Sequence, residues 1–416
     1  MKLKGLIHLI QYLFIFMPVF GMAQRLATIE VETDSDAQFA FPITIDLDAI
    51  TQLADSTLSL VESKENKLWE VAHQVENENG RKLVWMIRPD GVNEKRRFEI
   101  HNKKATENNG ILSLEHNSQS LIIRRNQQDL WQYNHAVAEA PEGADPAYAR
   151  SGFVHPMWSP TGKSLTRIQP PDHYHHYGLW NPWTRVEFQG ETIDFWNLKE
   201  RQGTVRFANV ITKNVGQVYA GYKVLHEHVV LKNELSPKVA LKEVQGTKIF
   251  MLEGEEDYYL ADISILLNCA TDDPVLLKEY RYGSLGWRTT EKWDRYNSEV
   301  ITSEGLNRKN ADGSLARWCI VQGEIDEDYA AVIMMSYPTN YNHPEPLRIW
   351  PEDQYDRGDM YANFAPTKNM DWDLQPGINY VLNYRFLVSS KKLSAEDAES
   401  AWKQFAKAPA ITIQVD

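Results

Sequence analysis

The sequence predicts an all-β fold, with a large two-sheet β-sandwich preceded by a small β-domain. Short segments rich in β-branched and aromatic residues recur along the chain, and turn sequences such as Asp312-Gly313 and Pro376-Gly377 separate them. This spacing is typical of sandwiches and other two-sheet architectures. Strands do not alternate regularly with helices, which argues against a doubly wound α/β fold.

The first 23 residues have the pattern of a signal peptide. Lys2 and Lys4 give the positive start, residues 6–20 are mostly apolar, and Gly21-Met22-Ala23 supplies small residues at the cleavage site. This apolar part is short for a membrane span, and no later segment approaches the required length. We therefore expect a secreted, soluble protein in the periplasm or outside the cell, without membrane insertion after the signal is removed.

A change in composition divides the rest of the chain. Residues 24–105 contain short strands and many acidic residues, enough for a small β-sandwich-like domain. Aromatic residues become dense from about residue 110, so residues 106–416 are expected to form the large sandwich that binds or transforms a ligand. No Pro- or Ser-rich linker separates the two parts, and we expect them to pack together.

Individual strands are predicted from short apolar or alternating runs. They lie at residues 82–87, 97–101, 121–125, 222–231, 248–252, 260–267, 318–322, 330–335 and 380–388. The clearest helix is expected at residues 394–408, where Ser394 and Asp397 resemble a capping box. Its apolar face carries Ala398, Ala401, Trp402 and Phe405, and a last strand is expected at residues 410–415.

Composition restricts the class of partner. The formal net charge of −13 argues against nucleic acid, because an acidic protein repels phosphate backbones. Thirteen tryptophans and nineteen tyrosines provide many rings, some of which could stack on sugar faces. Cys269 and Cys319 are too few for a disulfide scaffold, and form either one disulfide or two buried thiols.

The run His173-Tyr174-His175-His176-Tyr177 is the best candidate for the functional centre. Pro170-Pro171 precedes it and excludes a helix interior, so an extended run would put His173, His175 and Tyr177 on one face. Imidazole and phenol groups transfer protons near neutral pH, and His173, His175, His176 and Tyr177 are the predicted catalytic residues.

A metal ion at these histidines is the weaker interpretation. The His-x-His spacing suits two ligands of a divalent ion, but no HExxH-type motif completes the set. We therefore expect no cofactor.

Further candidates surround the cluster in the sequence. Arginine pairs with carboxylate or sulfate through two parallel hydrogen bonds, and tryptophan or tyrosine can support a sugar ring. The predicted substrate-binding residues are His155, Trp180, Arg185, Tyr282, Arg288, Asn340 and His343. An ordinary Asn/Pro turn at residues 340–344 is an equally good interpretation, and His226 and His228 are expected on a sheet surface.

The run from Pro170 to Trp180 resembles the signature of DUF6807, a family of secreted bacterial proteins. Asp194-Phe195-Trp196, Gly286-Trp287-Arg288 and the pair Asn340 and His343-Pro344 fit the same pattern, and the resemblance covers roughly residues 110–389. Tyr174 stands where proline is expected, and Tyr177 where arginine or histidine is common. We expect these two departures to alter the substrate.

The resemblance implies a galactose-mutarotase-like sandwich and a role alongside polysaccharide-degrading enzymes. The label of methane-oxygenase relatives that members often carry does not fit, because the chain lacks the spanning helices of that enzyme. Among such polysaccharide-degrading enzymes, lyases and dehydratases use His and Tyr as acid and base. They remove the proton α to a uronate carboxylate and expel the 4-oxygen, while Arg or His neutralises the carboxylate.

The expected function is therefore a secreted carbohydrate-active enzyme, a lyase or dehydratase that cleaves uronic-acid-containing oligosaccharides by β-elimination. Three alternatives remain open: a glycoside hydrolase, a non-catalytic glycan-binding protein and a metal-dependent enzyme.

Overall fold

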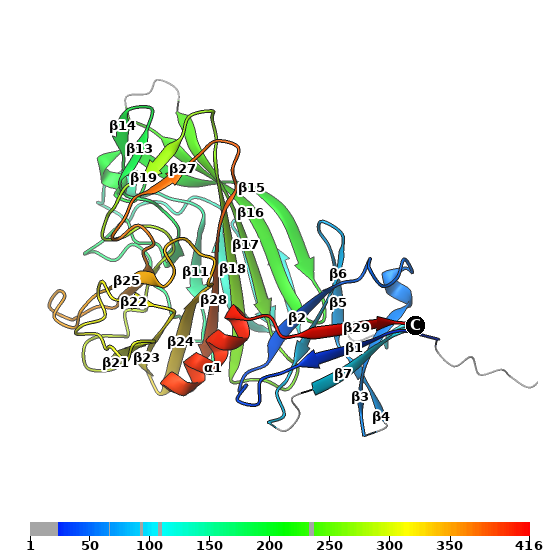
Figure 1. Ribbon diagram of the computed structural model, residues 1–416. Coiled ribbons are helices and arrows are strands. Elements are labelled where there is room, and N and C mark those ends of the chain that lie inside the picture. Colours follow the sequence, from blue (N-terminus) through cyan, green and yellow to red (C-terminus); the bar gives the residue numbers. More distant parts are fainter. Residues whose placement is uncertain (1–23, 66, 92–94, 107–109, 233–236) are drawn as a thin grey trace, which may run out of the picture.

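The computed structural model describes residues 24–65, 67–91, 95–106, 110–232 and 237–416 (Figure 1). The predicted signal peptide lies outside these residues. The described chain is almost entirely β-stranded, and the prediction of an all-β sandwich is confirmed. Among the described residues, no helix combines the length and the apolar character that a membrane span requires.

The N-terminal domain is a small sandwich of two sheets (Figure 1). One sheet contains, in spatial order, β29 (Ile411–Val415), β1 (Gln24–Glu32), β7 (Lys95–Asn102), β3 (Leu58–Lys64) and β4 (Lys67–Val71). The other contains β2 (Phe41–Asp46), β6 (Arg81–Ile87) and β5 (His73–Asn77). Ile29, Phe41, Leu60, Trp85 and Phe98 are buried between them.

The last strand of the chain completes this first domain. β29 pairs antiparallel with β1, with Ile29 opposite Ile413. The division at residue 105 expected from composition assigns residues 410–415 to the large unit, whereas the strand pairing places β29 in the N-terminal sheet. Composition could not reveal this, because an edge strand is joined by backbone hydrogen bonds that any sequence can make.

One face of the large sandwich is a sheet of long antiparallel strands, here named the long sheet. Its strands are, in order, β15 (Gly203–Val215), β16 (Tyr219–Val230), β17 (Lys238–Phe250), β18 (Tyr258–Cys269), β28 (Tyr380–Ser389), β24 (Asp328–Ser336), β23 (Trp318–Ile325) and β21 (Ser298–Thr302). On β28, Leu382, Tyr384, Phe386 and Val388 alternate into the main core as the sequence predicts. β17 begins ten residues before the predicted strand, because polar residues such as Lys242 and Glu243 interrupt its apolar pattern.

The opposite face is the broad sheet, which carries the candidate site. It contains, in order, β22 (Leu315–Ala316), β25 (Glu345–Ile349), β26 (Tyr361–Phe364), β20 (Gly286–Arg288), β12 (Leu179–Trp180), β11 (Phe153–Met157), β10 (Gln128–Asn134), β9 (Ser120–Arg125) and β8 (Leu112–His116). A small sheet of β14 (Glu191–Ile193), β13 (Val186–Phe188), β19 (Val275–Leu277) and β27 (Trp372–Leu374) lies at one end of the large sandwich (Figure 1).

The broad sheet is buried on both faces in its middle. Leu179, Trp287 and Ala362 point into the main core, whereas Trp180 and Tyr361 belong to a second cluster on the outer face. Period-two alternation therefore sends Arg288, Arg348 and Tyr361 outward from neighbouring strands. The 3-10 turn η2 (Pro146–Tyr148) lies between β10 and β11, and η3 (Leu198–Glu200) lies between β14 and β15. The third 3-10 turn of the described residues, η1 (Asp55–Thr57), lies in the N-terminal domain.

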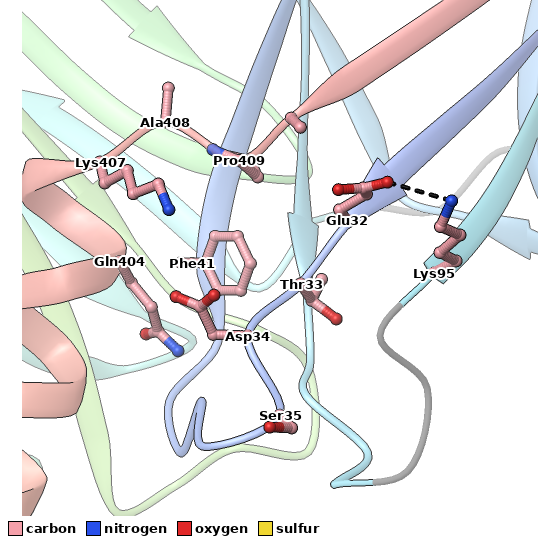
Figure 2. A pocket seen from close by; sticks show the side chains of 11 residues that line it. Glu32, Thr33, Asp34, Ser35, Phe41, Lys95, Gln404, Lys407, Ala408 and Pro409 are labelled. Carbon is pink, nitrogen blue, oxygen red and sulfur yellow. Dashed lines mark ion pairs between the residues drawn. The ribbon is translucent and has the colours of Figure 1, made fainter.

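The helix α1 (Ala395–Ala406) covers part of the outer face of the long sheet (Figure 1). Ala398 and Ala401 are buried there against Trp318 and Ile333. A cavity of about 430 Å³ lies between the segment after α1 and the N-terminal domain (Figure 2). It holds none of the predicted site residues, and Glu32 at its wall is paired with Lys95 at 3.1 Å.

The two cysteines do not form a disulfide. Cys319 is buried in β23, and the thiol of Cys269 donates to the carbonyl of Leu374 at 3.2 Å. Of the two alternatives that the sequence leaves open, the structure has free thiols.

The capping box of α1 gives a first prediction. The hydroxyl of Ser394 accepts from the Asp397 N–H at 3.1 Å, and the carboxylate of Asp397 accepts from the Ser394 N–H at 2.8 Å. We expect Ser394→Ala to lower the free energy of unfolding by about 1 kcal/mol in urea denaturation, and Ser394→Asn to retain most of it. Equal destabilisation by the two variants would contradict this role of the side-chain oxygen.

Candidate functional site

The histidine run does not form the extended segment expected from its sequence. It makes two consecutive turns, in which His173 N–H donates to Pro170 O at 2.8 Å and His176 N–H to His173 O at 3.0 Å. The turns bring the rings of His173 and His176 together, with centroids 4.6 Å apart and nearly parallel. Tyr177 consequently points the other way, into the aromatic cluster below the loop.

A cleft of about 110 Å³ opens beside these two rings, on the outer face of the broad sheet. The run, β25, β26 and the segments at residues 281–282 and 350–355 form its walls. It is lined by His173, His176, Trp196, Arg281, Tyr282, Arg348, Trp350, Gln354, Tyr355 and Tyr361. Of the predicted site residues, His173, His176 and Tyr282 line this cleft.

A chain of hydrogen bonds and ion pairs runs from the cleft into the protein. The hydroxyl of Tyr355 lies 3.1 Å from His173 Nε2, and His173 Nδ1 lies 2.8 Å from Asp172 Oδ2. Arg288 donates from Nη2 to Asp172 at 2.9 Å and to Asp359 at 2.7 Å. Burial opposes the ionisation of Asp172, but the hydrogen bond from His173 and the charge of Arg288 outweigh it, so the pKa of Asp172 is well below its usual value.

The charge of Asp172 fixes the tautomer of its neighbour. A carboxylate only accepts hydrogen bonds, so the neutral form of His173 carries its proton on Nδ1. Its Nε2 is then an acceptor that faces the hydroxyl of Tyr355. This arrangement of tyrosine, histidine and aspartate can move a proton between the cleft and the imidazole.

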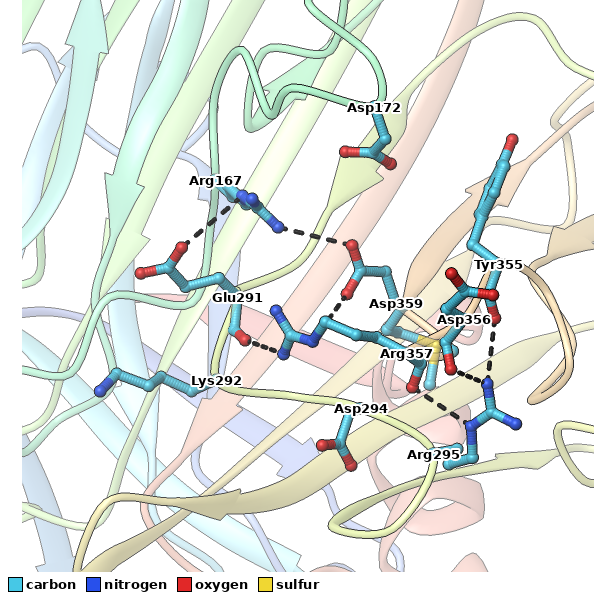
Figure 3. A network of polar contacts seen from close by, with 12 residues as sticks. Arg167, Asp172, Glu291, Lys292, Asp294, Arg295, Tyr355, Asp356, Arg357 and Asp359 are labelled. Atoms are coloured by element: carbon cyan, nitrogen blue, oxygen red, sulfur yellow. Dashed lines mark hydrogen bonds and ion pairs between the residues drawn. The ribbon is translucent and has the colours of Figure 1, made fainter.

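Arginine side chains from other segments hold the loop of Tyr355 by donating to its main-chain carbonyls (Figure 3). Arg295 Nη2 donates to the Tyr355 carbonyl at 3.0 Å and also to the Asp356 carbonyl, and Arg308 donates to Trp350 and Asp359 carbonyls at 3.0 and 2.8 Å. Tyr355 has φ of 58°, a left-handed conformation that is uncommon for a bulky side chain. Backbone in this region persists when the surrounding contacts enforce it, and it is frequent at functional sites.

The cleft wall has polar atoms that the described protein leaves without a partner. His176 Nδ1, the hydroxyl of Tyr361 and Arg348 Nε are all buried and unpaired among the described residues. Buried polar groups are normally satisfied, so three such atoms around one small cleft indicate a place for water or a polar ligand. Gly286 permits this arrangement, because a Cβ there would lie 2.5 Å from the Tyr361 hydroxyl.

Burial favours the neutral form of two histidines beside the cleft, His176 and His175. Burial, and then the charges of His175 and Arg288, lowers the pKa of His176 well below its ordinary value. Burial and the neighbouring His173 lower the pKa of His175 to about 3. The ring of His175 contacts both His173 and His176, at 5.4 and 4.8 Å between centroids, but it does not line the cleft.

Two arginines line the cleft on the side away from His173. Arg348 donates to Asp312 at 2.7 Å through Nη1, and its guanidinium lies over the ring of Tyr282 at 5.7 Å. Arg281 is exposed and lies over the same ring at 5.1 Å. Within the described residues, no carboxylate forms an ion pair with Arg281, and its pKa is raised, first by the neighbouring Tyr282.

Sequence reasoning missed Tyr355 and Arg348. These residues come from segments more than one hundred positions after the histidine run, and no local spacing links them to it. The density of charged and aromatic residues at 350–361 is a signal that could have been used, but many surface loops share it.

Several predicted residues support the cleft from behind. Tyr177 is fully buried, and its hydroxyl donates to the Tyr148 carbonyl and accepts from Gln169 Nε2 at 2.7 Å. Burial raises the pKa of Tyr177 to about 12. Trp180 packs against His176 at 5.1 Å between centroids. Arg288 is 1% exposed and binds Asp172 and Asp359, so it orients the chain of hydrogen bonds and does not line the cleft.

The remaining predicted residues lie elsewhere. Arg185 is exposed, with its guanidinium over the ring of Tyr280, 4.6 Å from the centroid. His155 lines a separate cavity of about 490 Å³, where burial lowers its pKa to about 4. Asn340 is buried against Glu345, and His343 stacks on Trp402 of α1 at 6.3 Å. The structure therefore does not bring Asn340 and His343 to the histidine run.

The sequence predicts that His226 and His228 lie on a sheet surface. In the structure both are buried within the main sandwich. Both contact Glu243 on the neighbouring strand, at 3.0 and 2.8 Å, and Tyr133 reaches His226 at 2.5 Å. Burial opposes the ionisation of Glu243, but the hydrogen bonds from the two histidines outweigh it and hold its pKa at about 2. Polar residues on alternating positions suggested solvent, whereas here they satisfy one another.

A buried arginine lies beside this group. Arg150 is 2% exposed, its three side-chain nitrogens have no hydrogen-bond partner among the described residues, and burial lowers its pKa to about 10. The charge of Glu243 partly compensates it. In the part of the chain that the structure describes, no group of three His, Cys, Asp or Glu side chains is arranged to hold a metal ion.

Comparison with known proteins gives one family. The model of the family of unknown function DUF6807 matches residues 120–403, which confirms the resemblance seen in the sequence. No curated protein matches the chain. A solved structure of heparinase III is similar at a TM-score of 0.33 and 9% identity, over 71% of this chain and 38% of that one. The chain thus spans well under half of that structure, and the likeness has no bearing on the reaction.

The buried carboxylate gives a second prediction. Glu243→Leu removes the acceptor of three buried donors, His226, His228 and Asn181, and also removes a negative charge that favours the charged form of Arg150. We expect a loss of about 3–5 kcal/mol in the free energy of unfolding. Glu243→Gln keeps one acceptor oxygen and should lose less. A leucine variant as stable as the wild type would contradict this assignment.

The buried histidines give a third prediction. The folded chain keeps His155 and His175 neutral down to about pH 4 and about pH 3, whereas the unfolded chain protonates them near pH 6.5. Between these values the unfolded state binds more protons, so stability falls as the pH is lowered. We expect urea unfolding to lose at most about 1.4 kcal/mol per pH unit for each histidine below about pH 6.5.

The matched variant for this measurement is His175→Gln, which removes one titrating group. Its free energy of unfolding should fall less steeply than that of the wild type between about pH 6.5 and pH 4. Parallel curves for the two proteins would show that His175 is protonated in the folded state as well.

Proposed function

The chain belongs to DUF6807, a family of unknown function, and we propose that it is a carbohydrate-active enzyme that cleaves uronic-acid-containing oligosaccharides by β-elimination. The observation that supports this is the chain Tyr355–His173–Asp172, which ends in a cleft with two arginines. The cleft combines a proton-transfer pair, cations and aromatic rings, the three features that the elimination requires. Secretion of the protein is part of the same proposal.

The arginines would bind the uronate carboxylate. A guanidinium and a carboxylate make two parallel charge-assisted hydrogen bonds, and Arg348 has a buried, unpaired Nε for one of them. Arg281 adds a second cation without a carboxylate partner among the described residues. When the α-proton leaves, negative charge moves onto the carboxylate, and cations fixed at that place stabilise the enolate-like transition state.

The tyrosine and histidine would transfer the proton. The base removes the hydrogen on the carbon next to the carboxylate, and the electron pair of that C–H bond forms the double bond to the adjacent carbon. The bond from that second carbon to the 4-oxygen breaks, and the oxygen takes a proton from the acid. Tyr355 and His173 share one proton across 3.1 Å, so the pair can give and accept it without change in net charge.

The other walls would orient the sugar. His176 Nδ1 is an unpaired acceptor or donor, and the Tyr361 hydroxyl can do both, so either can bind a sugar hydroxyl. Trp196 and Trp350 supply ring faces. A volume of about 110 Å³ is below the range of about 300–1,000 Å³ usual for ligand pockets, so one sugar ring at most enters the cleft.

The composition of the cleft favours elimination over hydrolysis. Glycoside hydrolases use two carboxylic groups that flank the scissile bond. None of the described residues that line the cleft is Asp or Glu, and Asp172 lies behind His173 in contact with Arg288. A non-catalytic glycan-binding protein remains the second candidate, because rings and arginines alone suffice for binding.

The test is an activity assay with uronic-acid-containing oligosaccharides, among them oligogalacturonates and oligoalginates. We expect new absorbance at the band of the unsaturated uronate. Tyr355→Phe should reduce kcat by about 10²–10⁴-fold, because it removes the transferable proton. Tyr296→Phe is the matched control, since Tyr296 is 89% exposed and does not line the cleft.

The outcomes separate the candidates. Products that have gained water and lack the absorbance would assign a glycoside hydrolase. Binding without any product across the panel would assign a glycan-binding protein. Full activity of Tyr355→Phe would show that another residue transfers the proton.

A further inference from the structure

We infer that a second anionic sugar residue binds outside the cleft, along a strip formed by Arg185, Tyr280, Arg281 and Tyr282. The inference rests on the proposed function and extends it to the class of substrate, an oligosaccharide with negative charges on successive residues. The strip begins at Arg281 and Tyr282 in the cleft wall and continues to Arg185 on the surface.

The strip is an ordered stack of cations and rings. The guanidinium of Arg185 lies 4.6 Å from the centroid of Tyr280, and the rings of Tyr280 and Tyr282 meet edge to face at 5.4 Å. Arg281 lies 5.1 Å from the centroid of Tyr282 and 5.8 Å from that of Tyr280. Trp196 stacks on Tyr282 at 5.3 Å between centroids and also lines the cleft, so it connects the strip to the cleft.

Main-chain and side-chain contacts hold the strip in place. The hydroxyl of Thr184 donates to the Tyr282 carbonyl at 2.9 Å, and the Lys278 N–H donates to the Arg185 carbonyl at 2.8 Å. These contacts fix the start of β13 beside residues 278–282. The small sheet therefore already holds Arg185 next to Tyr280 in the protein without a ligand.

The charges of the strip are not used within the protein. Arg185 and Arg281 are exposed, and among the described residues neither forms an ion pair. The neighbouring Lys278 differs, since it is bound to Asp371 at 2.7 Å and has its pKa raised first by that hydrogen bond. On a chain with a formal net charge of −13, two adjacent unpaired guanidiniums form a local cationic surface that suits an anion.

The stacking also directs these cations. The guanidinium of Arg185 lies over the Tyr280 ring with its flat face, which leaves its N–H edges for a carboxylate or a sulfate. One anionic group in the cleft and a second one at Arg185 would thus fit a chain that carries charge on more than one residue.

The experiment measures binding with Tyr355→Phe as the background, so that turnover does not interfere. Dissociation constants are determined by calorimetry for oligogalacturonates of two and of four residues. Adding Arg185→Gln should weaken binding of the four-residue ligand about tenfold and leave the two-residue ligand nearly unchanged. Arg206→Gln is the matched control, because Arg206 is also exposed but lies in β15 and is paired with Glu227.

Two further ligands identify the anion. A dextran sulfate oligosaccharide carries sulfate only, and a malto-oligosaccharide carries no charge. Loss of affinity for the oligogalacturonate alone assigns carboxylate, and loss for both anionic ligands assigns any anion. Raised salt should reduce the difference in dissociation constant between the proteins with and without Arg185→Gln, because salt screens charges that are exposed to solvent.

The results distinguish failure of the strip from failure of the proposed reaction. If Arg185→Gln has no effect on the longer ligand, or weakens the malto-oligosaccharide equally, or if no anionic oligosaccharide binds, the strip is refuted. If the length-dependent effect is found but the wild type makes no product, the strip stands and the elimination does not.

Discussion

The candidate site depends on one buried cation. Arg288 on β20 binds Asp172 of the histidine run and Asp359 at the start of β26, and its guanidinium lies over Trp350 at 4.6 Å. Asp172 directly precedes the histidine run, whereas Trp350 and Asp359 both lie in the connection between β25 and β26, so a single side chain joins that connection to the histidine run. A buried charge that loses one partner is strongly destabilised, and this forces the loop to keep Asp172, and with it His173, in one place.

Unpaired buried polar groups occur at two places in the large sandwich. Glu243, between its sheets, accepts from His226, His228 and Asn181, but the neighbouring Arg150 has side-chain nitrogens without a partner among the described residues. At the cleft wall, His176 Nδ1 and the Tyr361 hydroxyl likewise lack partners among the described residues. Such groups cost about 1–3 kcal/mol each, and those at the cleft lie where a bound polar group could pair with them.

The fold could be predicted further than the site. Strands such as β18 and β28 follow the period of two, and the capping box of Ser394 and Asp397 marks α1 in the sequence, because these signals are local. The position of Tyr355 opposite His173 depends on the pairing order of the broad sheet, which no short pattern encodes. The two turns of the histidine run were also not predictable from its sequence. They bring His176 to the cleft and take Tyr177 away from it.

The two departures from the family pattern can now be placed, and they lie outside the cleft. The ring of Tyr174 packs on Tyr148 at 5.4 Å, and the hydroxyl of Tyr177 donates to the Tyr148 carbonyl, so both anchor the run to the segment at η2. The expectation that they alter the substrate therefore finds no contact in the cleft to support it. Selectivity has to come from side chains that reach the ligand, and under the proposed function these are Arg281 and Arg348, which line the cleft and which the histidine signature does not contain.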